Sequence, residues 1–272
     1  MDIQQARTFL AIVAHGSFLE AAGRLHVTQS TVSARIRSLE DELGAKLFIR
    51  NRSGASLTGA GRRFLRHAKA LVLTMQQAQY DVGLPERYST SVRIGGRIAL
   101  WDGFLPAWAG WMRQHAPDVS IRSDIGFEDD LMRRMVEGSL DIAVMYTPSH
   151  SAGLTVEHLF DETLVMISTD PSTRWPDDGY IYVEWGPGFF AHHREAFPDV
   201  EHPPQIVNIG WLGVQLILAN GGSTYLPVRM ARPLIEAGRV HLVKEAPEFP
   251  HPAYMVFPRE LDDDNLRLAI EG

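Results

Sequence analysis

The chain has 272 residues and a formal charge of −7, from 26 Lys and Arg against 33 Asp and Glu. Its 45% hydrophobic and 22% charged residues exclude a mostly disordered chain, and no run approaches the roughly 20 apolar residues of a membrane span. With no cysteine, disulfides, thiolate nucleophiles and cysteine-ligated metals are excluded. The N-terminus lacks the basic and apolar blocks of a signal peptide, so we expect a cytoplasmic protein without membrane association.

The charge is unevenly distributed along the chain. Residues 1–90 hold 12 Lys and Arg against 7 Asp and Glu, a net charge of +5, whereas residues 91–272 carry −12. The acidity of the whole chain argues against a nucleic-acid partner. The uneven distribution of charge instead indicates a basic nucleic-acid-binding module joined to an acidic domain. A chance fluctuation in the positions of charged residues is the alternative.

Helical periodicity dominates the first 44 residues. Apolar spacing predicts a helix over 3–14 that ends at Gly16, and Ser17 with Glu20 three residues later is a capping-box pattern that starts the next helix. Thr28 is a good N-cap for a third helix, which Gly44 ends.

The third helix carries a polar face opposite its apolar stripe, so the last two helices are predicted to form a helix-turn-helix. In the major groove of double-stranded DNA, Gln pairs with adenine and Arg with guanine, while hydroxyls hold phosphates. A solvated face on an ordinary helical bundle is the alternative. The predicted DNA-binding residues of this helix and its cap are Thr28, Gln29, Ser30, Thr31, Ser33, Arg35 and Arg37.

Two short extended segments around a Gly-containing turn follow, over residues 47–57, and predict a β-wing. Arg50 and Arg52 would lie at or near its tip, within reach of a minor groove or the DNA backbone.

From Thr58 to about Arg87 the pattern predicts one long helix with a heptad seam, which Gly83, Pro85 and Ser89 are expected to end as a linker. A single helix cannot bury such a seam, so we expect a homodimer, with packing on the chain's own body as the alternative. The seam consists of Phe64, Ala68, Leu71, Met75, Ala78 and Val82.

These residues together resemble the winged helix-turn-helix of LysR-type transcriptional regulators. The match runs from Ala21-Ala22 through Thr28-Gln29-Ser30 and Leu39-Glu40 to Leu57-Thr58 and Gly61. Ser30 stands where the family commonly has Pro, Ala34 where it has Arg, and Arg35 where it has Gln. This protein is therefore expected to recognise different DNA bases from typical members while docking on DNA in the same way.

The resemblance implies more than the motif shows. Such proteins pair through the linker helix, often form tetramers, and carry an effector-binding domain like a type 2 periplasmic binding protein, with two α/β lobes. Effector binding would change the arrangement of the dimers relative to one another, and with it DNA bending or contact with RNA polymerase. Trp185-Gly186-Pro187 and the segment 222–227 further resemble the branch that includes repressors of flagellar genes.

The strand and helix patterns of the C-terminal two thirds of the chain predict an α/β domain, independently of the family resemblance. Strand and helix patterns alternate β-α-β-α-β over residues 92–146. Further strands are predicted over 163–168, 180–183 and 240–243, with helices over 210–219 and within 226–237. We expect a crossover near 160–162 and a return near 244–254. The predicted division is a DNA-binding domain over 1–60, a linker helix over 61–90 and an effector domain over 91–272, with lobe I over 91–160 and 245–272 and lobe II over 161–244.

Ligands of open α/β sheets bind at the carboxyl ends of strands, beside helix N-termini. Arg97 and Ala99 stand where the family usually has Ser and Thr; Arg97 either clamps an anionic effector or pairs with Glu128 or Asp129. Trp101, Trp185 and Tyr225 are either an aromatic wall or core residues. The candidate effector residues are Arg97, Ile98, Ala99, Trp101, Phe127, Glu128, Tyr146, Thr147, Trp185, Gly186, Ser223 and Tyr225; Ser223 and Tyr225 are expected in a turn.

No enzyme motif stands out. Walker-A, G-x-G-x-x-G and G-x-S-x-G patterns are absent. The segment HHREAFPDVEH (192–202) lacks metal-ligand spacing, and its prolines predict a surface loop. The run Asp262-Asp263-Asp264 could bind a cation, but an acidic run near a C-terminus is usually solvated. We therefore predict no metal and no cofactor, and a sequence-specific regulator controlled by a small molecule. The alternatives are an architectural DNA-binding protein and, less favoured, a small α/β enzyme.

Overall fold

A computed structural model describes residues 1–51, 54–173, 178–198, 200, 203–261 and 263–272. It divides into two compact units, Met1–Arg87 and Tyr88–Gly272, each with its own hydrophobic core. In the described part of the chain, no helix combines the length and apolar character that a membrane span requires.

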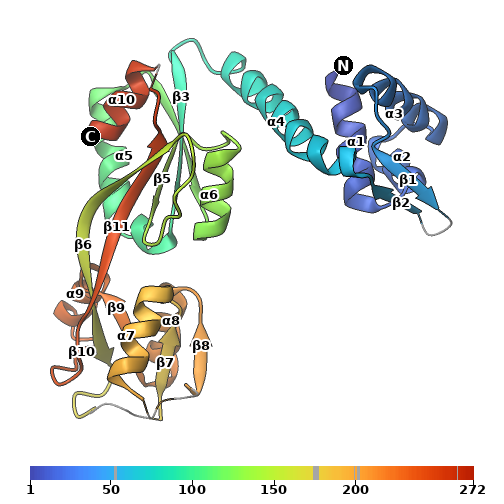
Figure 1. The fold of residues 1–272 in the computed structure, drawn as a ribbon. Helices are drawn as coiled ribbons and strands as arrows, with labels where there is room; N and C mark the ends of the chain where they lie inside the picture. Colours follow the sequence, from blue (N-terminus) through green and yellow to red (C-terminus); the bar gives the residue numbers. More distant parts are fainter. Residues whose placement is uncertain (52–53, 174–177, 199, 201–202, 262) are drawn as a thin grey trace. The chain divides into compact units, whose positions relative to one another are not determined.

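The first unit contains the predicted helix-turn-helix (Figure 1). Its first three helices are α1 (Ile3–His15), α2 (Phe18–Leu25) and α3 (Gln29–Leu43). Ser17 and Thr28 cap α2 and α3 with their hydroxyls, as predicted, and Gly16 and Gly44 end α1 and α3 in left-handed conformations. The sequence did not predict the cap of α1, where Asp2 and Gln5 form a reciprocal capping box.

The wing and a long helix complete this unit. They comprise β1 (Phe48–Asn51), β2 (Gly54–Leu57) and α4 (Gly59–Val82). The strands pair antiparallel, Phe48 opposite Leu57. Thr58 caps α4, which ends at Val82, before the approximate limit of Arg87. Gly83, the first of the residues expected to end the helix, terminates it, and Pro85 follows.

The second unit is built on one mixed sheet flanked by helices (Figure 1). The strands run in the order β4-β3-β5-β11-β6-β9-β7-β8, with β10 paired to β6. In chain order the elements are β3 (Thr90–Gly96), η1 (Ile98–Trp101), α5 (Phe104–His115), β4 (Val119–Ile125), α6 (Glu128–Val136), β5 (Ile142–Met145), β6 (Leu154–Ser168), β7 (Tyr180–Val183), α7 (Pro187–Ala196), β8 (Gln205–Val207), α8 (Gly210–Asn220), β9 (Ser223–Pro227), α9 (Val228–Glu236), β10 (His241–Leu242), β11 (Phe249–Pro258) and α10 (Asp264–Glu271).

Two long antiparallel strands, β6 and β11, connect two lobes of the sheet (Figure 1). Lobe I holds β3, β4 and β5, and lobe II holds β7, β8 and β9. The predicted crossover near 160–162 falls on β6, and the predicted return near 244–254 overlaps the first part of β11, which bulges at Ala253/Tyr254. The sequence predicted only the Thr163–Ser168 part of β6 and no strand at β11.

Two local predictions in lobe II are wrong. His192 and His193 lie on α7 rather than in a surface loop: Pro187 occupies the first turn, where its missing amide costs nothing, and Phe189 and His193 are buried against the sheet. Ser223 and Tyr225 lie in strand β9 rather than in a turn.

Candidate DNA-binding surface and effector site

The N-terminus of α3 presents a cluster of hydroxyls. Thr28 Oγ1 accepts from the amide of Thr31 at 3.2 Å and lies 2.8 Å from Ser30 Oγ and 2.9 Å from Thr31 Oγ1. Thr28, Gln29 and Ser30 are exposed. Exposed hydroxyls at a helix N-terminus, where amides and the helix dipole favour negative charge, suit a DNA phosphate.

The two arginines of α3 occupy different sides of the helix. Ser30, Ser33 and Arg37 are three or four residues apart and share one side, and Arg37 is exposed. Arg35 falls outside this spacing: it is half-buried, and its Nη1 donates to Thr8 Oγ1 of α1 at 3.4 Å. Arg37 is therefore the arginine of α3 that faces outward with Ser30 and Ser33.

Glu40 ties the end of α3 to the wing. It is buried, and its Oε1 accepts from the amide of Leu47 at 2.8 Å while Lys46 Nζ donates to Oε2 at 2.7 Å. Burial by itself would raise the pKa of Glu40, but these partners outweigh it and hold the pKa below its usual value. The carboxylate thereby fixes the start of β1 relative to α3.

The wing lies against the ends of α1 and α2. The amide of Ala55 donates to Gly16 O at 2.7 Å, and a Cβ on Gly54 would lie 2.4 Å from that oxygen. Arg50 is exposed, with its Cζ 3.7 Å from the centre of the Phe18 ring. Arg52, the other basic residue predicted for the wing, lies outside the described residues.

The heptad seam of α4 divides into two parts. Phe64 and Ala68 are buried in the core of the first unit, so this half follows the alternative in which the seam packs on the chain's own body. The other positions, Leu71, Met75, Ala78 and Val82, are exposed. Beside them lies a groove of about 730 Å³, lined by Met1, Asp2, Ile3, Leu43, Phe64, His67, Ala70, Leu71, Thr74, Met75 and Ala78.

Arg97 is the central charged group at the junction of the two lobes. It follows β3, its amide donates to Val144 O, and it is only 6% exposed. Its Nε lies 3.2 Å from Glu128 Oε1, and its Cζ lies 4.5 Å from the centre of the Phe127 ring. The sequence left open whether Arg97 clamps an anionic effector or pairs with Glu128 or Asp129, and the structure contains the ion pair with Glu128.

A buried network that the sequence analysis missed lies beside Arg97. Tyr146 Oη donates to Glu162 Oε2 at 2.8 Å, and Arg229 donates both to Glu162 Oε1 and to the carbonyl of Ala99, each at 2.8 Å. Burial, followed by the charge of Glu162, raises the pKa of Tyr146 well above its usual value. Arg229 follows β9 at the start of α9, so the strand-end rule would have identified it had β9 been predicted.

His251 of β11 was also missed, because that strand was not predicted. Its ring stacks on Tyr146 at 3.8 Å and meets Trp185 edge-on at 5.5 Å. Its Nε2 is buried and has no hydrogen-bond partner among the described residues. Burial, assisted by the charge of Arg97, lowers the pKa of His251 to about 3, so the ring is neutral at pH 7.

The remaining candidates divide between the junction and the core. Thr147 is exposed and lies close to Gly186, and the half-buried Ile98 adjoins Ala99. Trp101 Nε1 donates to Asp124 O at 3.2 Å. Trp185, Tyr225 and Ser223 belong to the buried part of lobe II. Trp185 Nε1 donates to Tyr225 O at 2.9 Å, and Tyr225 Oη donates to Pro247 O at 3.0 Å. Ser223 is fully buried in β9.

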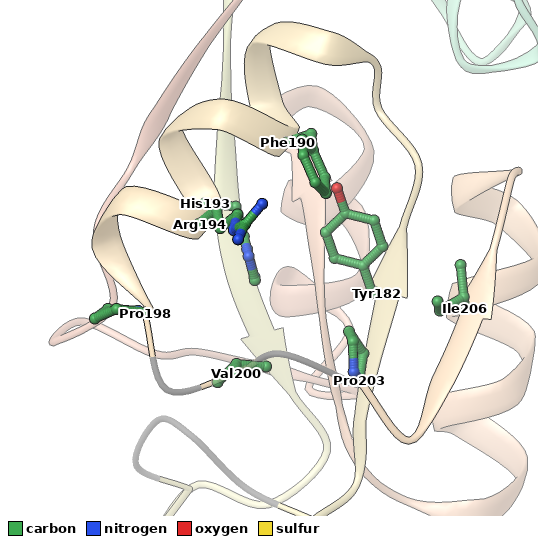
Figure 2. Close-up of a pocket in the computed structure, with 8 residues that line it drawn as sticks. All are labelled: Tyr182, Phe190, His193, Arg194, Pro198, Val200, Pro203 and Ile206. Carbon is green, nitrogen blue, oxygen red and sulfur yellow. The ribbon is translucent and has the colours of Figure 1, made fainter.

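A separate cavity of about 370 Å³ lies beside α7 (Figure 2). Phe190, His193 and Arg194 of α7 line it together with Tyr182 of β7 and Ile206 of β8. His193 Nε2 lies 3.0 Å from Tyr180 Oη, and burial lowers the pKa of His193 to about 4. Across the described residues, no three His, Asp or Glu side chains gather in a way that could hold a metal ion.

Comparison with known proteins identifies the family. Residues 3–62 match the bacterial regulatory helix-turn-helix protein family of LysR type, and residues 85–270 match the LysR substrate binding domain. The chain is 30% identical to the HTH-type transcriptional regulator HdfR of Escherichia coli over 98% of its own length and 95% of that protein.

Solved structures show the same fold. CbnR, a LysR family regulator solved with its target DNA, superposes with a TM-score of 0.69 at 17% identity, covering 100% of this chain and 98% of that one. ArgP from Mycobacterium tuberculosis gives a TM-score of 0.62 at 24% identity, with coverage of 100% and 98%. The chain belongs to the LysR family of transcriptional regulators, with an N-terminal helix-turn-helix DNA-binding domain and a C-terminal effector-binding domain.

Proposed function

We propose that the outward side of α3 reads a specific DNA sequence in the major groove. Ser30, Ser33 and Arg37 face one side of the helix, and the Thr28 cap places its hydroxyl beside the amides of the first turn. The exposed Arg50 of the wing reaches the DNA backbone or minor groove, as does Arg52 by its position in the sequence. The related fold of CbnR, crystallised with target DNA, supports this mode of docking.

The effector-binding residues are proposed at the junction of the lobes, around Arg97. The observation that carries this assignment is a group of three buried nitrogens, Arg97 Nε, His251 Nε2 and Arg229 Nη1, that lack hydrogen-bond partners within the described residues. Thr147, Gly186 and Phe127 border the same junction. Tyr225 and Ser223 are fully buried, so they support the packing of lobe II and do not contact the ligand.

The proposed assembly is a homodimer through the exposed part of the α4 seam, with a tetramer, as the family resemblance implies, formed by two such dimers. Leu71 and Met75 line an apolar groove, and Val82 is 88% exposed. A second copy of α4 would bury these side chains. The domain division that fits this assembly is 1–60, 61–90 and 91–272, close to the unit boundary between Arg87 and Tyr88.

The function proposed is therefore ligand-controlled transcription regulation in the cytoplasm, with neither catalysis nor a cofactor. Binding at the lobe junction would change how dimers present α3 to DNA or contact RNA polymerase. The 30% identity to HdfR supports placing the chain in the HdfR branch of the family.

Sequencing of genomic fragments bound by the full-length protein, followed by footprinting, tests this proposal. We expect discrete protected sites of twofold symmetry, with affinity that falls steeply as salt rises. Uniform coating of DNA would instead indicate an architectural protein that ignores sequence.

A further inference from the structure

The polar groups at the lobe junction are unequally satisfied. Glu162 uses both carboxylate oxygens, one on Tyr146 and one on Arg229. Arg97 Nε, His251 Nε2 and Arg229 Nη1 are buried, yet none of the three has a hydrogen-bond partner in the part of the chain that the structure describes. Because buried donors and acceptors in native proteins are nearly always satisfied, these nitrogens mark a place that a further polar group fills.

Glu128 holds Arg97 only loosely. Its Oε1 comes within 3.2 Å of Arg97 Nε without the alignment of a hydrogen bond. An arginine fork is best satisfied by a carboxylate that accepts two parallel hydrogen bonds. Glu128 is 23% exposed at the first position of α6, where its charge favours the helix N-terminus even when it turns toward solvent.

We propose that the effector is a small organic carboxylate whose acid group displaces Glu128 from Arg97 and also engages His251 Nε2. The proposal rests on the proposed function, in which the effector binds at this junction. One carboxylate replaces another on Arg97, so no additional buried cation is needed to compensate the ligand.

Other ligand charges fit this site less well. A phosphate dianion would bring extra negative charge close to the buried carboxylate of Glu162, and a cation would meet the guanidinium groups of Arg97 and Arg229. The ring of Phe127, which is 45% exposed and lies beside the Arg97 guanidinium, offers apolar contact to the rest of the ligand.

The test measures ligand-induced thermal stabilisation and titration calorimetry on the full-length protein. The probes are propionate, succinate and phenylacetate, each paired with its uncharged amide, together with inorganic phosphate and the cation ethylammonium. The variants are Arg97→Gln and Glu128→Gln, with Glu137→Gln as a control that removes the same charge just beyond the other end of α6. Thermal unfolding of every variant without ligand is measured in parallel to show that its second unit folds.

We expect at least one carboxylate, but not its amide, to stabilise the wild type. Arg97→Gln should weaken its binding at least about tenfold, the loss expected for a charge-assisted hydrogen bond. Glu128→Gln should tighten binding several-fold because the competitor is neutral, and Glu137→Gln should leave it unchanged.

Equal binding of acid and amide, preferred binding of phosphate or ethylammonium, or weaker binding to Glu128→Gln would each overturn the carboxylate class while leaving an effector site at the junction. No stabilisation by any carboxylate would also overturn it. Failure of the regulator function appears separately, as the loss of discrete footprints in wild-type protein without any probe.

Discussion

Arg229 of lobe II donates a hydrogen bond of 2.8 Å to the carbonyl of Ala99 in lobe I. The same guanidinium pairs with Glu162 on the strand that connects the lobes. One side chain thus links both lobes to the connecting strand at the site where we place the effector.

Replacing Arg229 should destabilise the second unit. In Arg229→Met, the carboxylate of Glu162 stays buried without its cation, so we expect a loss of about 3 kcal/mol in unfolding free energy. Denaturant unfolding checks this, with Arg232→Met as the control, since Arg232 is exposed on the same helix. Equal stability of the two variants would show that the link between the lobes contributes nothing.

The two arginines of α3 should respond differently to truncation. Arg37→Ala should weaken binding to the specific site by about 1–3 kcal/mol and relax its sequence preference if Arg37 contacts a base. Arg35→Ala loses the contact with Thr8 and should act mainly through the packing of α1 on α3. Affinity for the specific site, measured in competition with random DNA, distinguishes a base contact of Arg37 from a phosphate contact. An equal loss of affinity for both DNAs in Arg37→Ala would identify a phosphate contact.

Charge placed in the exposed half of the α4 seam should prevent assembly. Met75→Glu puts a carboxylate beside the apolar groove, and we expect sedimentation to show a shift from dimer toward monomer. Gln76→Glu adds the same charge at the adjacent exposed position and should leave the dimer intact. If both variants sediment as the wild type does, the seam is not the interface.

The second unit should lose stability as the pH falls from about 6.5 to about 4. Burial lowers the pKa of His193 to about 4, so over this interval the unfolded chain takes up a proton that the folded state refuses. The contribution of His193 is present above pH 6.5 and amounts to about 1–3 kcal/mol. Unfolding measured across this range should be less pH-dependent in His193→Gln than in the wild type, whereas a change at the exposed His192, His192→Gln, should keep the wild-type slope.

Two glycines of the first unit should respond with opposite signs to alanine. Gly54 has φ +133° and its Cβ would meet Gly16 O, so Gly54→Ala should cost about 1–3 kcal/mol. Gly23 lies inside α2 with open space around it, so Gly23→Ala should stabilise by up to about 1 kcal/mol. Thermal unfolding of both variants decides; tolerance of Gly54→Ala would mean that the wing does not need its close approach to α1.

Much of this protein could be predicted from local sequence signals. Caps such as Thr28 and Gly44 act within a few residues, so they reveal helix boundaries without tertiary information. The uneven charge and the helix-turn-helix spacing likewise identified the DNA-binding unit, and the family it belongs to is confirmed. The first three strands of lobe I were also predicted correctly, because their apolar runs alternate with helical patterns.

Tertiary structure alone decided which of these residues act together. Periodicity could not tell that Phe64 packs inward while Met75 stays exposed, because both occupy the same seam and only the neighbouring helices distinguish them. His251 and Glu162 lie 89 positions apart in the chain and meet only because β11 and β6 pair antiparallel. A charge buried in such a pairing leaves no local pattern, since its partner comes from strands and lobes that the chain reaches much later.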